Sequence, residues 1–151
     1  MSKPKINFII NKKLFPEFIN LSVFRGNARF ITMEVLKGES QIIDIINMKF
    51  CSDSEIREIN AEFLGHDYET DIITFRYDDE SLVESDILIS VETVIRNSLK
   101  YKNSFIIEAY RVIIHGVLHL CGYEDDTRSK RLRIRTKENI YLNKLRNKGI
   151  K

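Results

Sequence analysis

An apolar segment that carries two histidines constrains the fold of this chain more than any other stretch. Residues 111–126 read RVIIHGVLHLCGYEDD, and the run from 105 to 120 is apolar on nearly every side, which predicts a buried central helix. His115 and His119 are four residues apart, so both imidazoles lie on one helix face, one turn apart. Two histidines at this spacing can bind one metal ion.

A third ligand has to come from beyond Gly122, which predicts the end of this helix. One helix cannot place three side chains around an ion at tetrahedral angles. Three carboxylates follow the glycine, and Asp125 is the preferred ligand, with Glu124 and Asp126 as alternatives. Two histidines and one carboxylate leave a position for water, as in catalytic zinc sites. The competing interpretation, two core histidines satisfied by hydrogen bonds, does not account for the acidic cluster.

The expected cofactor is one Zn²⁺ per chain. Zinc lowers the pKa of bound water from about 15.7 to about 7, which provides hydroxide at neutral pH. An aspartate in place of a third histidine makes the site less positive by one charge. That change weakens the pull on the protons of bound water and widens the choice of metal toward harder divalent ions.

Gly116 occupies the position at which zinc proteases of the HExxH type carry their general base. A glycine has no side chain that can take a proton, so a metal-dependent peptidase is disfavoured. The expected role of Gly116 is to let another backbone or the substrate approach closely.

The charge of the chain is strongly asymmetric. Residues 127–151 carry ten Lys/Arg and one acid, Glu138, a net charge of +9, whereas residues 1–126 carry 14 basic and 21 acidic side chains, a net charge of −7. A basic segment on an acidic body is a candidate polyanion-binding surface. The alternative is a solvated helix face that packs on its own acidic domain.

The remaining patterns predict one α+β domain over residues 1–151, with a small mixed sheet and helices packed on it. The metal site is expected at the C-terminal end of the central helix. Strands are expected at 6–10, 41–50, 71–77 and 86–90, and helices at 16–36, 52–64 (with Ile56, Ile59 and Phe63 facing the core), 91–101 and 104–120, with a surface helix at 127–148. Cys51 and Cys121 have no CxxC spacing, and no signal-peptide or membrane-spanning pattern is seen, so a cytoplasmic protein with reduced thiols is expected.

Three ordered blocks carry a more specific signal. Residues 115–123 (HGVLHLCGY) are similar to HGxLHLxGYDH, residues 59–75 (INAEFLGHDYETDIITF) to LNxxYRxKDxPTDVLSF, and residues 85–90 (SDILIS) to GDIxIS. The chain thereby resembles the YbeY family of bacterial metal-dependent endoribonucleases. This resemblance implies cleavage of single-stranded RNA in rRNA maturation and ribosome quality control. It implies rRNA precursors and the ribosome or its proteins as partners, with no membrane and no DNA.

Three departures from the family pattern concern the predicted site. The third histidine of the family falls at Asp125, its arginine at Leu64 and its lysine at His66. The resemblance implicates the family arginine in function, and Arg57 and Arg76 are weak candidates for substrate binding in its place. His66 is a further weak candidate that would line the same cleft; its alternative is a loop histidine on the surface. If catalysis has been lost with that arginine, the alternative function is a ribosome-assembly binding module with a structural or vestigial metal site.

Overall fold

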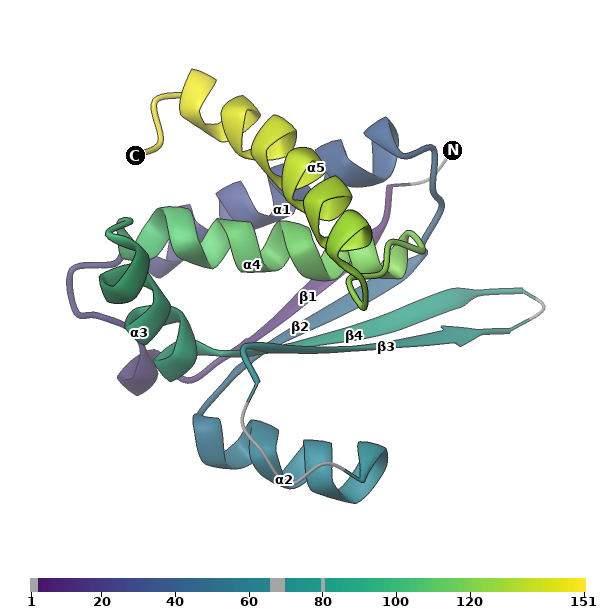
Figure 1. Cartoon of the computed structure of the whole chain (residues 1–151), viewed down its shortest axis with the longest axis horizontal. Coiled ribbons are helices and arrows are strands. Elements are labelled where there is room, and N and C mark those ends of the chain that lie inside the picture. The colour runs from purple at the N-terminus through teal and green to yellow at the C-terminus, as the bar shows by residue number, and fades with distance from the viewer. Residues whose placement is uncertain (1–2, 66–69, 80) are drawn as a thin grey trace.

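The structure, a computed structural model that describes residues 3–65, 70–79 and 81–151, has the predicted α+β architecture. In the described residues a four-stranded sheet has the order β1-β2-β4-β3 (Figure 1). The strands are β1 (Lys5–Ile10), β2 (Ile45–Cys51), β3 (Ile72–Asp78) and β4 (Val83–Ser90). The sheet is mixed, because β1, β2 and β4 are parallel while β3 runs antiparallel to β4.

Helices cover the two faces of this sheet unequally. They are α1 (Leu21–Gly38), α2 (Asp53–Leu64), α3 (Val91–Tyr101), α4 (Phe105–Leu120) and α5 (Arg128–Asn147), and a short 3₁₀ helix, η1, spans Lys12–Leu14. Figure 1 shows α1, α4 and α5 over one face and α2 on the other. Helix α4 contacts α1, α3, α5, β3 and β4, which confirms its prediction as the central helix. None of the helices in the described part of the chain has the length and apolarity needed to cross a bilayer.

Local capping explains where the best-predicted helices begin and end. Ser52 and Glu55 form a capping box at the start of α2, and Gly65 ends that helix with φ +70°. The Ser104 hydroxyl accepts a hydrogen bond from the backbone N–H of Ile107 and caps α4. Serine caps were visible in the sequence, so these boundaries were predictable.

The prediction for the first helix was wrong at its start. Helix α1 begins at Leu21, five residues after Pro16, because the Asn20 side chain caps it by accepting from the N–H of Val23. Phe18, inside the predicted helix range, lies before α1 and is 79% exposed. Likewise β2 begins at Ile45, four residues after the predicted start, since the chain from 41 to 44 forms a connection.

One side-chain prediction was also wrong. Phe63 on α2, expected to face the core, is 64% exposed, because α2 packs on the sheet mainly through Ile56. The surface helix predicted at 127–148 is confirmed as α5: most of its residues are exposed, and an apolar stripe of Ile134, Tyr141, Leu142 and Leu145 packs against the core.

Close packing between α4 and the sheet depends on Gly116. A Cβ at this position would overlap Cδ1 of Ile72 on β3 and lie 3.2 Å from Cγ2 of Ile87 on β4. The glycine therefore permits a close approach, as predicted, but side chains of the sheet occupy the space, rather than backbone or substrate.

We expect Gly116→Ala to destabilise the protein by about 1–2 kcal/mol, since overpacking a core costs about 1–3 kcal/mol and the higher helix propensity of alanine returns up to about 1 kcal/mol. Ile72→Val removes the overlapping Cδ1 atom, so the same glycine substitution should be neutral or stabilising in that background. Urea unfolding of the two single variants and the double variant measures this coupling. Equal effects of Gly116→Ala in both backgrounds would contradict the packing argument.

Candidate metal centre

His115, His119 and Asp125 converge on one point at the C-terminal end of α4. The Nε2 atoms of the two histidines are 2.9 Å apart, and Asp125 Oδ2 lies 3.3 Å from His115 Nε2 and 3.4 Å from His119 Nε2. Three ligands about 2.0–2.1 Å from a tetrahedral zinc ion would be separated by about 3.3 Å. The spacing and the donor set of two imidazoles and one carboxylate therefore fit a small divalent ion.

The chain after α4 selects Asp125 from the three acids. Cys121 caps α4, and Gly122 with φ +99° turns the backbone so that the loop folds back over the histidines. Glu124 and Asp126 face away from them and pair with Lys130 at 2.7 and 3.0 Å. Among the described residues, Asp125 is therefore the acid that joins the histidine pair, as the sequence had favoured.

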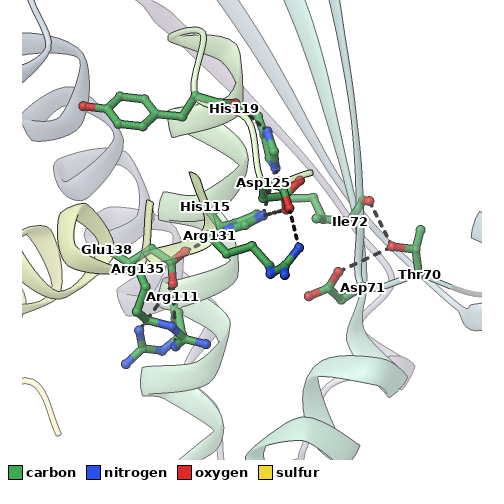
Figure 2. Close-up of polar contacts among 11 residues, drawn as sticks. Thr70, Asp71, Ile72, Arg111, His115, His119, Asp125, Arg131, Arg135 and Glu138 are labelled. Atoms are coloured by element: carbon green, nitrogen blue, oxygen red, sulfur yellow. Dashed lines mark hydrogen bonds and ion pairs between the residues drawn. The ribbon is translucent and has the colours of Figure 1, made fainter. Parts of the chain in front are cut away.

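The second nitrogen of each histidine is held by an outer partner. His119 Nδ1 lies 2.8 Å from the carbonyl oxygen of Tyr123, and His115 Nδ1 lies 2.8 Å from Glu138 Oε2 on α5. With both Nδ1 atoms donating a hydrogen, both Nε2 atoms are left as acceptors for the metal. Figure 2 shows Glu138 behind His115, on the side away from Asp125.

Sequence reasoning missed Glu138, which was counted only as the one acid of the basic segment. Its side chain is 4% exposed, and Arg111 Nη1 and Arg135 Nη1 lie 3.3 and 3.8 Å from its Oε1. A signal was available: Glu138 lies four residues after Ile134 and three before Tyr141, on the buried stripe of α5. A lone carboxylate on an apolar stripe usually has a specific partner.

The charges around His115 favour its protonated form in the absence of metal. Burial by itself lowers the pKa of His115, but the hydrogen bond to Glu138 and the negative charges of Glu138, Asp71 and Asp125 outweigh it and raise the pKa. A metal ion therefore competes with a proton for this imidazole, and metal affinity should fall as the pH falls.

A cleft of about 340 Å³ opens over His115, His119 and Asp125, the three candidate ligands. Its other walls come from α2, through Asn60 and Leu64, and from the chain at 70–74 that enters β3. Asp71 lies in this wall, and burial raises its pKa, partly countered by His115. Leu64, at the position of the family arginine, is about half exposed and lines the cleft with an apolar side chain.

Neither Arg76 nor Arg57, two of the weak candidates for substrate binding, lines the cleft. Arg76 is turned away from the cleft: its Nη1 donates to the carbonyl oxygen of Leu120 at 2.6 Å and its Nε to Asp78 at 2.8 Å, so it holds the C-terminal end of α4. Arg57 is exposed on α2, and in the described residues it does not line the cleft. His66 lies outside the described residues.

Comparison with known proteins identifies the family of the chain. A family model described as Endoribonuclease YbeY matches residues 20–146. The chain belongs to this family. YbeY endoribonucleases of Chlorobium limicola and Chloroherpeton thalassium are 41% and 44% identical to it, over 74% and 72% of this chain and 78% and 77% of theirs. That of Amoebophilus asiaticus is 42% identical over 77% of this chain and 82% of its own.

The fold agrees with that membership. The solution structure of a Thermotoga maritima protein matches with a TM-score of 0.63 at 25% identity, covering 97% of this chain and 93% of that one. The mixed sheet and its covering helices are thus shared with a solved structure. The predicted resemblance to the YbeY family is confirmed.

Proposed function

We propose that this member of the YbeY family is a metal-dependent endoribonuclease that cuts single-stranded RNA in rRNA maturation and ribosome quality control. It acts in the cytoplasm, as one domain over residues 1–151, on rRNA precursors and in contact with the ribosome. The observation that carries the proposal is the convergence of His115, His119 and Asp125 at the base of a cleft, in a chain of this family.

The described side chains suit hydrolysis of a phosphodiester. A bound Zn²⁺ or similar divalent ion would supply an activated water and stabilise charge on the scissile phosphate. Glu138 and the Tyr123 carbonyl orient the imidazoles, so the ligand set needs little rearrangement to accept the ion. Asp125, being anionic where the family has a histidine, lowers the positive charge of the site by one.

Removal and return of metal tests this proposal against a binding module with a structural or vestigial site. A single-stranded RNA substrate is incubated with protein purified in a chelator, and Zn²⁺, Mn²⁺ or Mg²⁺ is then added back. We expect no cleavage without metal, restored cleavage with at least one ion, and a melting temperature changed by only a few degrees, since the core around α4 is built from apolar side chains other than the three candidate ligands. Loss of folding on chelation, or no cleavage with any ion, would support the binding module instead.

A further inference from the structure

A second groove, of about 230 Å³, shares Asp71, His115 and Asp125 with the cleft but is not lined by Leu64. It runs between α4 and α5 and reaches the end of α3. Helix α4 contributes Glu108, Arg111 and His115, and helix α5 contributes Arg131, Arg135 and Glu138. On each helix these positions follow the spacing i, i+3 or i+4, i+7 and share one face. At 1.5 Å per residue, the stripe on α4 extends about 10 Å from His115. The groove therefore begins at a metal ligand and leads away from it.

Guanidinium groups line the accessible part of this groove. Arg131 Nη1 donates to the carbonyl oxygen of Asp125 at 3.3 Å, which places a positive charge beside the metal ligands, and Figure 2 shows its guanidinium reaching past Asp125 toward the side of Asp71. Arg135, one turn further along α5, has a side chain that is 56% exposed.

The carboxylates of the groove are withdrawn and already paired. Glu138 is occupied by His115, Arg111 and Arg135. Glu108 is 4% exposed; it accepts from the amide of Asn103 at 3.3 Å, and its Oε2 lies 4.0 Å from Arg111 Nε. Apart from Asp71 and Asp125 at the metal end, the groove thus presents Arg131 and Arg135 to solvent and keeps its carboxylates buried, which favours an anionic ligand.

The far end of the groove adds an aromatic ring. Tyr101, the last residue of α3, lines the groove and is 56% exposed, with Lys100 Nζ 5.3 Å from its ring centroid. Asn97 lies one turn before it on the same face and offers an amide. An exposed ring beside cationic side chains is the combination that binds single-stranded nucleic acid, because bases stack on the ring while phosphates meet the cations. A small inorganic anion has no base that could stack on the ring.

We propose that this groove is a second RNA-binding subsite, in which Arg131 and Arg135 bind backbone phosphates beside the scissile one and a base stacks on Tyr101. The proposal rests on the endoribonuclease function proposed above. The subsite takes the strand on one side of the cut, while the cleft at Leu64 takes it on the other.

Binding of a fluorescent single-stranded RNA to the full chain tests the subsite separately from catalysis. A chelator prevents cleavage, and affinity is measured by anisotropy at several salt concentrations for Arg131→Gln, Arg135→Gln, Tyr101→Ala and Tyr101→Phe. Arg146→Gln is the matched control, since it removes the same charge from the exposed far end of α5. Each phosphate contact in a single strand contributes about 0.7 to the slope of log affinity against log salt.

We expect Arg131→Gln and Arg135→Gln each to lower that slope by about 0.7, and Arg146→Gln to leave it near the wild-type value. Tyr101→Ala should weaken binding about tenfold at constant slope, and Tyr101→Phe should retain it, because stacking needs the ring and not the hydroxyl. Slopes for Arg131→Gln and Arg135→Gln equal to that of Arg146→Gln, or equal affinities for Tyr101→Ala and Tyr101→Phe, would overturn the subsite.

The two proposals fail in different ways. If the wild-type protein binds the strand through these residues but does not cut it in the presence of any of the metals, the endoribonuclease proposal is disproved. The subsite proposal is then unaffected. If cleavage requires metal but RNA affinity is unchanged by substitution of Arg131, Arg135 or Tyr101, only the subsite proposal is disproved. In the second case the strand enters through the cleft at Leu64.

Discussion

Alanine in place of His119 or Asp125 is expected to lower RNA cleavage by at least about a hundredfold, because loss of an outer partner alone typically costs 10- to 100-fold. Each variant leaves two of the three ligand atoms that converge within 4.8 Å. Cleavage rates of a single-stranded RNA and the metal content of each purified variant are the measurements. Both variants should stay folded, since neither side chain belongs to the apolar core.

Asp126→Ala is the matched control for this experiment. Asp126 is adjacent to Asp125 in the same acidic loop, but its carboxylate pairs with Lys130 and faces solvent. It should retain wild-type cleavage and wild-type metal content. If Asp125→Ala and Asp126→Ala lose metal to the same degree, the loop acts only through its overall negative charge and Asp125 is not a ligand.

Glu138→Gln is expected to have the second largest effect, a 10- to 100-fold loss of metal affinity. Glutamine keeps the shape of the side chain but removes the charge that holds His115 Nδ1. It also leaves Arg111, whose side chain is 13% exposed, without its nearest carboxylate, at a cost on the order of 3 kcal/mol for a largely buried pair. Competition with a chromophoric chelator measures the affinity, and excess metal should restore most of the cleavage.

The metal-free stability of this variant should depend on pH in a defined direction. The folded protein raises the pKa of His115, with Glu138 as the main cause opposing burial. The stabilisation from this group is therefore fully present below the unfolded imidazole pKa of about 6.5 and is lost as the pH rises through the folded value. Urea unfolding in chelator should show a larger difference between wild type and Glu138→Gln at pH 5.5 than at pH 8.

Glu124→Gln provides the control for these measurements, because Glu124 is exposed and pairs with Lys130 at the surface. Surface ion pairs contribute about 0–1 kcal/mol, so this variant should change neither stability nor metal affinity appreciably. A stability difference for Glu138→Gln that is independent of pH would show that its contact with Arg111, rather than with His115, is what stabilises the fold.

Short-range patterns in the sequence determined the elements that carry the site. The spacing of His115 and His119 in an apolar run, with Ser104 before it and Gly122 after it, defined a central helix with both imidazoles on one face. The capping box at Ser52 defined α2 in the same way. Such features involve residues three or four apart, whose geometry follows from the helix itself.

Three-dimensional structure decided the rest. The sequence favoured Asp125 but left Glu124 and Asp126 as alternatives; the turn at Gly122 and the pairing of the other two acids with Lys130 separate them. Glu138 lies 23 residues from His115 along the chain, and only the packing of α5 on α4 brings the two together.

The same packing determines which side chains of the basic C-terminal segment are buried and which are exposed. By itself the sequence determined that α5 is strongly basic, but not which of its basic side chains would lie beside the metal centre. Because the apolar face of α5 packs on the core, Arg131 and Arg135 line the groove beside the candidate metal centre. The net charge of the segment follows from its composition, whereas the position of the charges on the protein surface depends on which face of the helix packs on the core.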